Sequence, residues 1–144
     1  QNLSTIRGLM QSQGQWGGIH AVYNIYNATR ICELRQFAEE TKTTVLWQNL
    51  FQPNYLDPFL HGATVAAAAI SEIEQFYTLG IATSAEQKFF DQALITYWAN
   101  LGSNKMSEVD VAFKKHIQDI ENIYHTDQAG EFVKLWPELT HLCR

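Results

Sequence analysis

The sequence predicts a helix-rich α/β fold built as one domain of 144 residues. Apolar residues make up 46% of the chain and charged residues only 17%, which is enough apolar surface for a single core. Helical and strand-like patterns alternate in the first third of the sequence, and after residue 62 only helical patterns occur. We therefore expect a single domain, 1–144, with a βαβ part at 1–57 and a helical part at 63–144.

The βαβ part begins with apolar residues at helical spacing from Asn2 to Gln13. Ile19 to Tyr26 then alternates, with apolar residues on both faces, which predicts a strand covered on both sides. A helical stripe follows over residues 31–38, and Asn27 or Thr29 is expected to cap that helix.

A second short strand is predicted from Thr43 to Gln48. A strand, a helix and a strand in this order usually form a parallel pair. Two strands are too few for an independently stable sheet, and both outer edges would be unpaired. We therefore expect added strands from a partner chain, from self-association, or from a segment N-terminal to Gln1. The chain begins with Gln1 and not with Met, so we expect that something was removed or that it is a piece of a longer product.

The helical part follows a loop at residues 50–62. Helices are expected over residues 63–79, from 85 to 101, over 108–124 and from 129 to 142. Gly80 should end the first of them, and Thr83 with Glu86 has the form of a capping box for the second. Pro137 should start a new turn, because proline suits the first position of a helix.

Composition excludes several classes of function. The net charge is −5 and no basic run is longer than Lys114-Lys115, so neither nucleic acid nor an anionic membrane is an expected partner. No apolar stretch approaches the roughly 20 residues that span a bilayer. Two cysteines, Cys32 and Cys143, do not make a disulfide scaffold and suggest reduced thiols in a cytoplasmic protein. A small-molecule ligand or another protein remains as the expected partner.

No complete catalytic motif is present, and the catalytic residues stay unknown. The glycine-rich phosphate loops and the G-x-S-x-G nucleophile motif are missing. His141 and Cys143 offer only two possible metal ligands near the terminus, so no metal site is expected. Cys32 is expected to be a buried, inert thiol. His20 and His61 are the histidines that could act as proton donors.

Polar residues at the carboxyl ends of the predicted strands are the best candidates for a ligand site. Ligands of βα sheets bind in the loops that follow the strands, and amides and phenols suit hydrogen bonding to a polar organic molecule. The alternative is that they are ordinary capping and turn residues. The candidates are Asn24, Tyr26, Asn27, Gln48, Asn49 and Tyr55.

The same segments carry a family resemblance. They are residues 22–27 (VYNIYN), 33–39 (ELRQFAE), 47–56 (WQNLFQPNYL), 119–123 (DIENI), Phe132 and 136–139 (WPEL). In this order they resemble the second half of phage-type radical SAM proteins that carry a twitch domain. The resemblance spans most of the chain, but its motifs are loose and none is catalytic.

The resemblance implies that the strands are late strands of a partial βα barrel and that the helices are its C-terminal extension. It implies S-adenosylmethionine (SAM) as a cofactor, with Asn24, Asn27, Gln48 and Asn49 on the SAM or substrate side. The family cleaves SAM reductively with a [4Fe–4S] cluster, but the cluster-binding C-x-x-x-C-x-x-C is absent here. A cluster is therefore expected only if a missing N-terminal half exists.

Three functions follow as hypotheses. The first is the C-terminal portion of a radical-SAM-like protein, which supplies a polar wall and a helical cap and is not catalytic alone. The second is a non-catalytic phage or bacterial helical domain that binds a protein. The third is a small, iron-independent enzyme acting on a nucleoside-like ligand such as SAM.

Overall fold

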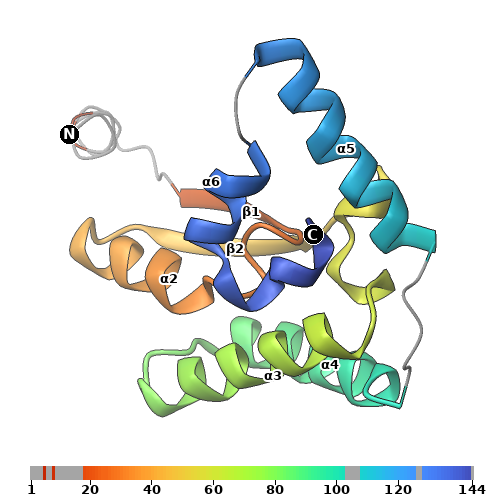
Figure 1. The fold of residues 1–144 in the computed structure, drawn as a ribbon. Helices are drawn as coiled ribbons and strands as arrows, with labels where there is room; N and C mark the ends of the chain where they lie inside the picture. The colour runs from red at the N-terminus through yellow and green to blue at the C-terminus, as the bar shows by residue number, and fades with distance from the viewer. Residues whose placement is uncertain (1–4, 6–7, 9–17, 103–107, 126–127, 144) are drawn as a thin grey trace.

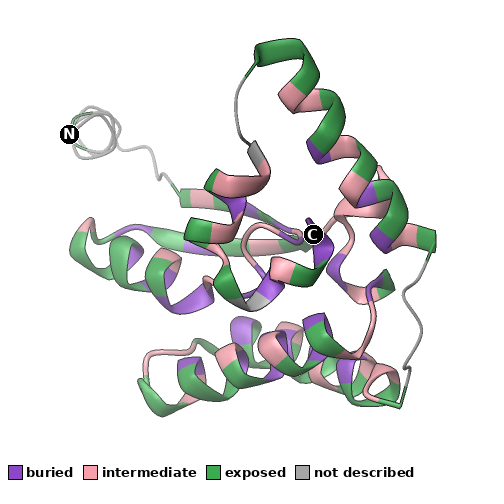
Figure 2. Cartoon of the chain, viewed as in Figure 1, coloured by how far each residue is buried: buried purple, intermediate pink, exposed green. Residues whose placement is uncertain are grey.

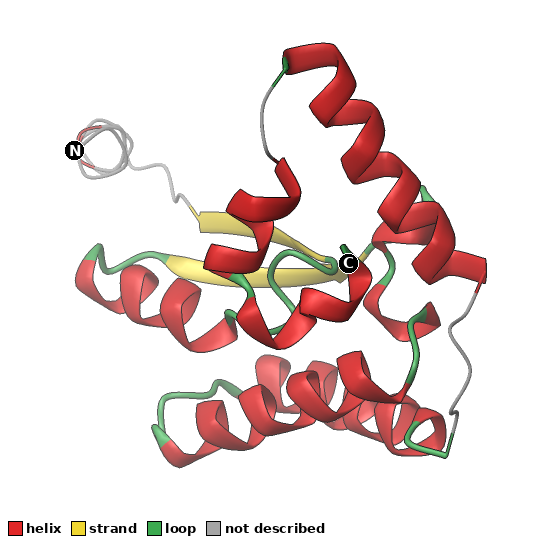
Figure 3. Cartoon of the chain, viewed as in Figure 1, coloured by secondary structure: helices red, strands yellow, loops and turns green. Residues whose placement is uncertain are grey.

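The computed structural model describes residues 5, 8, 18–102, 108–125 and 128–143. Within these residues five α-helices, three 3₁₀ helices and a two-stranded sheet form a helix-rich α/β fold, which confirms the predicted class (Figures 1 and 3). The helix expected from Asn2 to Gln13 falls almost wholly outside the described residues. Among the described helices there is no candidate for a membrane-spanning segment.

The βαβ part consists of β1 (Gly18–Tyr23), α2 (Ile31–Glu40) and β2 (Thr44–Asn49). The two strands are parallel, as predicted, with a register that runs from Gly18↔Thr44 to Tyr23↔Asn49. The first strand was expected to continue to Tyr26, but it ends three residues earlier. It ends there because the chain enters a turn in which the Ala28 N–H donates to the Asn24 carbonyl, at 2.9 Å.

The helical part follows the predicted order closely. Gly80, at φ +66°, follows Leu79, the C-cap residue of the first helix, and the capping box of Thr83 and Glu86 opens the second. Pro137 occupies the first turn of the last element, as expected. The elements are η1 (Asn54–Leu56), η2 (Pro58–Leu60), α3 (Ala63–Thr78), α4 (Ser84–Asn100), α5 (Glu108–Tyr124), α6 (Gln128–Leu135) and η3 (Pro137–Leu142).

One face of the sheet packs on helices. Tyr23 and Trp47 join a core with buried residues of α3 and α4, while Ala21 and Val45 pack against Ala38 of α2. The rings of Trp47 and Phe90 lie 5.1 Å apart. Because β-strand side chains alternate between faces, these residues define the covered side of the sheet.

The opposite face of the sheet is open, so the prediction that the first strand is covered on both sides is wrong for the described residues. His20 is exposed, Val22 is 37% exposed and Leu46 is 55% exposed. Exposed positions alternate with buried or intermediate ones along both strands (Figure 2). Apolar residues on this face gave the pattern of a fully buried strand, but no described element packs over them.

A second core lies between the helical part and the loop after β1. Ile25 from that loop and Val65 of α3 are fully buried, together with Phe113 of α5 and Leu139 of η3. This core attaches α5, α6 and η3 to the rest of the chain (Figure 1). It is separate from the core under the sheet.

The start of α2 is not capped as predicted. Its N-cap residue is Arg30, whose side chain makes no capping hydrogen bond. The carboxylate of Glu72, in α3, instead accepts from the Cys32 N–H at 2.8 Å. A backbone N–H in the first turn of α2 is thus satisfied by a side chain of a neighbouring helix. Neither predicted cap residue takes this role. The Asn27 side chain hydrogen-bonds within its own turn, and the buried Thr29 hydroxyl has no hydrogen-bond partner among the described residues.

Candidate functional site

The loops that follow the two strands are tied together at the carboxyl edge of the sheet. The Leu50 N–H donates to the Tyr23 carbonyl at 3.3 Å, which continues the parallel ladder by one residue. The Ile25 N–H donates to the Leu56 carbonyl at 2.9 Å. These two bonds place the candidate residues of both loops at one edge.

Asn24 and Asn27 interlock in the turn after β1. The Asn27 side-chain oxygen accepts from the Asn24 N–H at 2.9 Å, and both side-chain amides donate to the Val22 carbonyl at 2.9 Å. The Asn24 side-chain oxygen accepts from the Tyr26 N–H, also at 2.9 Å. Both asparagines therefore hold the turn together, although each amide nitrogen has a second hydrogen that these bonds do not use.

Gln48 and Asn49 end β2 and differ in their surroundings. Gln48 is exposed on the open face, opposite Val22 in the register. The Asn49 side-chain oxygen is buried, and it accepts no hydrogen bond from any described residue. A buried acceptor without a donor costs about 1–3 kcal/mol, so this oxygen is the strongest local sign of an absent partner.

Tyr26 and Tyr55 do not join this group, because their rings pack against the second core. The Tyr26 ring packs in the second core, 5.7 Å from the Trp136 ring, and burial raises the pKa of its phenol. Tyr55 packs beside the same core, with its ring 4.8 Å from the imidazole of His116. Four of the six candidates thus remain at the carboxyl edge.

The two candidate histidines are not placed as proton donors to that edge. His20 is exposed on the open face, three pairs before the end of β1. His61 is buried, with its Nδ1 2.5 Å from a carboxylate oxygen of Asp110 and its Nε2 3.1 Å from the Tyr55 carbonyl. Both of its nitrogens are engaged, so His61 is a buried structural contact.

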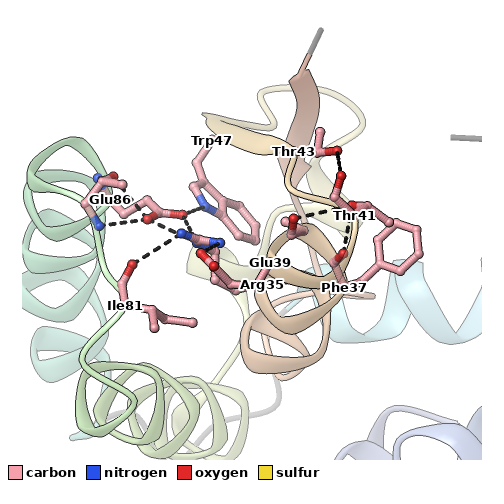
Figure 4. Close-up of polar contacts among 10 residues, drawn as sticks. Arg35, Phe37, Glu39, Thr41, Thr43, Trp47, Ile81 and Glu86 are labelled. Carbon is pink, nitrogen blue, oxygen red and sulfur yellow. Dashed lines mark hydrogen bonds and ion pairs between the residues drawn. The ribbon is translucent and has the colours of Figure 1, made fainter. Parts of the chain in front are cut away.

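Sequence reasoning missed a buried polar cluster under the sheet (Figure 4). The Arg35 Nε lies 3.1 Å from a carboxylate oxygen of Glu86, and the Trp47 indole N–H donates to the same carboxylate at 3.3 Å. The Arg35 guanidinium also donates to the Ile81 carbonyl and pairs with Glu39. The cluster joins α2, β2 and α4, and the Arg35 guanidinium lies between the carboxylates of Glu39 and Glu86.

The capping box was the available signal for this cluster. Glu86 was expected to accept from the Thr83 N–H, and it does so at 2.9 Å. That bond uses one carboxylate oxygen and leaves the other to face Arg35 and Trp47. Nothing in the spacing of Arg35 along α2 indicates that its side chain would reach Glu86, 51 residues later.

The two cysteines are buried in different cores. Cys32 belongs to the core under the sheet and Cys143 to the second core. Burial and the nearby Glu72 raise the pKa of the Cys32 thiol to about 12, as expected of an inert thiol. In the described part of the chain no three His, Cys, Asp or Glu side chains gather as they would around a metal ion.

The arrangement at the carboxyl edge can hydrogen-bond a neutral or cationic polar group. It offers amide donors from Asn24, Asn27 and Gln48 and an unpaired acceptor from Asn49, with no ionisable side chain among them. It holds no general acid or base. No family model, no curated protein and no solved structure matches this chain.

Proposed function

We propose that this chain is the C-terminal portion of a radical-SAM-like protein, in which it supplies a polar wall and a helical cap. The observation that supports this most is the one-sided parallel pair, β1 and β2. Helices cover one face of it, while the other face is exposed and the outer edges are unpaired within the described residues. A barrel built from βα units has this arrangement, with helices outside and the inner face of the strands turned to the interior.

The inner face of such a barrel would be formed by alternate residues of the two strands. Three register pairs, Gly18↔Thr44, His20↔Leu46 and Val22↔Gln48, form the open face here. Isolated in water, this face exposes apolar side chains at its centre, which is costly unless other strands cover it. Gln48 lies at the carboxyl end of this face, and Asn24, Asn27 and Asn49 lie at the same edge of the sheet, where βα barrels bind their ligands.

The residues present do not fit a [4Fe–4S] cluster. Such a cluster is held by several thiolates, and the two cysteines here are buried in separate cores. A cluster, if the whole protein has one, would be bound by residues outside it.

The carboxyl edge does fit part of a SAM molecule. SAM carries an adenine amine and an ammonium group, both donors, and the buried Asn49 oxygen is an acceptor that lacks a donor. Asn24, Asn27 and Gln48 would hydrogen-bond the acceptors of the same ligand. When bound, SAM would supply the adenosyl and methionine groups of the reaction, while this chain would bind and orient them.

The test begins with the coding sequence upstream of Gln1. We expect an in-frame extension that encodes C-x-x-x-C-x-x-C. The product of the whole reading frame, reconstituted with iron and sulfide without oxygen and reduced with dithionite, should release 5′-deoxyadenosine from SAM.

Two variants of the full-length product separate a role at the carboxyl edge from a general effect. Asn49→Ala should weaken SAM binding about tenfold or more, since a hydrogen bond to a buried group is lost. Gln36→Ala, on the exposed side of α2, is the control and should leave binding unchanged. Absence of the cysteine motif, or equal binding by both variants, would contradict the proposal.

Exposed apolar side chains on the helices favour a second candidate, a helical domain that binds a protein. Ile95 and Trp98 of α4 are 64% and 56% exposed, and Ile123 and Tyr124 of α5 are each 68% exposed. Large exposed apolar residues on neighbouring turns are typical of interaction surfaces.

A rise in the melting temperature of the 144-residue chain on addition of SAM alone would instead favour the small, iron-independent enzyme.

A further inference from the structure

A hollow of about 330 Å³ runs along the outer edge of β2. From the strand it is lined by Val45, Leu46 and Trp47, and from α4 by residues 85, 86, 88 and 89. Consecutive residues of a strand point to opposite faces, so a hollow that touches three of them in a row lies along the edge and not on a face. Since β1 occupies one edge of β2, the hollow lies along the other one. We call it the β2 edge groove.

The backbone of β2 presents hydrogen-bonding groups to this groove. The Leu50 N–H points to β1, where it donates to the Tyr23 carbonyl. Backbone groups alternate in direction along a strand. The N–H and C=O groups of Leu46 and Gln48 therefore also point to β1, while those of Val45 and Trp47 point away from it. The N–H and C=O of Val45 and Trp47 are thus placed to pair with a further strand.

The side chains of the groove suit an apolar residue flanked by an acidic one. Leu46 is 55% exposed, and Trp47 and Phe89 are half-buried beside it. Glu86 is already neutralised by Arg35. The exposed Lys88 belongs to no ion pair among the described residues, so its ammonium group is available to an acidic side chain of a bound segment.

The described chain does not itself fill the groove. After β2 the described elements are helical, and none of them pairs with the strand. A βα barrel continued from the N-terminal side would join the sheet beside β1, not here. Further barrel strands would therefore cover the outer edge of β1 and leave the outer edge of β2 unpaired.

We propose that the β2 edge groove binds an extended segment of another protein by strand addition. The segment would pair with the outward backbone groups of Val45 and Trp47. It would place an apolar side chain between Leu46 and Phe89, and an acidic side chain would reach Lys88. Main-chain pairing gives such a site its affinity, while the apolar pocket and the charge give it specificity.

The experiment measures binding of a fluorescein-labelled peptide, Val-Thr-Val-Asp-Val-Thr-Val, to the 144-residue chain by fluorescence anisotropy. Leu46→Arg should weaken binding at least tenfold, because it places a long charged side chain over the groove. The matched control is Val111→Arg on α5, since Val111 is 53% exposed. It should change binding less than twofold.

Reversing the charge at position 88 and in the peptide separates an effect on binding from a loss of folding, because an unfolded variant would bind neither peptide. Lys88→Glu should weaken binding of the aspartate peptide about fivefold and strengthen binding of the same peptide with lysine in place of aspartate. The exposed Lys115→Glu on α5 should do neither. A peptide with both threonines replaced by proline should not bind, because proline removes backbone donors.

Three results would overturn the proposal. One is no binding of the aspartate peptide, and another is equal binding by the Leu46 and Val111 variants. The third is a dimer in sedimentation that only Leu46→Arg dissociates, which would assign the groove to a second copy of the chain.

Discussion

The imidazole of His61 and the carboxylate of Asp110 form a buried contact, with 2.5 Å between Nδ1 and Oδ1. Their side chains are 0% and 4% exposed. The other ring nitrogen lies 3.1 Å from the Tyr55 carbonyl, and because a carbonyl only accepts, that nitrogen carries a proton. The contact fixes the start of α5 to the segment between η2 and α3, so it joins α5 to the rest of the fold.

Asp110→Ala should lower the free energy of unfolding by about 3 kcal/mol, because it leaves a buried histidine without its partner. The measurement is urea unfolding followed by circular dichroism. Asp119→Ala, at an exposed position of the same helix, is the control and should change stability by less than about 0.5 kcal/mol. Equal effects of the two substitutions would mean that the buried contact contributes nothing specific.

Glu86→Gln should destabilise the chain more than Thr83→Ala. The first substitution removes the charge that balances the buried Arg35 and should cost about 2–3 kcal/mol. The second removes the hydroxyl that accepts from the Glu86 N–H at 3.2 Å and should cost about 1 kcal/mol. Urea unfolding of both variants checks the order. Equal losses would assign the stabilisation to the helix cap and not to the ion pair.

The local elements were predictable because their signals are local. The box of Thr83 and Glu86, the glycine at position 80 and Pro137 each act within one turn, so the sequence shows them directly. The open face of the sheet was not predictable. Val22 and Leu46 have the apolar character of buried residues, and only the arrangement of helices in space shows that nothing described covers them.

The candidate site was predicted in part for the same reason. Gln48 and Asn49 are the last two residues of β2, so strand geometry places them at the carboxyl edge. Tyr26 lies three residues beyond the end of its strand, and its ring is directed by contacts with residues more than a hundred positions later, such as Trp136. Contacts of that sequence separation leave no mark in the local pattern.

Cys32 should resist alkylation in the folded chain. With its pKa raised to about 12, only about one thiol in ten thousand is ionised at pH 8, and the thiolate is the reactive form. In a Cys143→Ala variant, which leaves one thiol, we expect labelling by iodoacetamide at pH 8 to be at least a hundredfold slower in buffer than in 6 M guanidinium. Comparable rates in the two conditions would contradict the buried placement.

The raised pKa of Cys32 also makes the free energy of unfolding depend on pH. The folded pKa of Cys32 lies above the ordinary value of 9.0, so its contribution is complete below pH 9 and is lost as the pH rises toward 12. Urea unfolding at pH 8 and pH 10 should therefore show a larger loss for the wild type than for Cys32→Ala. An equal loss in both chains would rule out Cys32 as a source of the pH dependence.

Gly80→Ala should cost about 1 kcal/mol of unfolding free energy through the backbone alone. Gly80 has φ +66°, a conformation that a residue with a Cβ adopts only with strain, and a Cβ placed there would meet no atom within 4 Å. Gly80→Asn should cost less, since asparagine tolerates this region. Gly102→Ala is the control, because a Cβ there also meets nothing within 4 Å but its φ is not in the left-handed range. Gly102→Ala should therefore be neutral or slightly stabilising, since it restricts the unfolded chain. Thermal and urea unfolding of the three variants measure these differences. A loss at Gly102 as large as that at Gly80 would show that the left-handed turn is not what the glycine at position 80 provides.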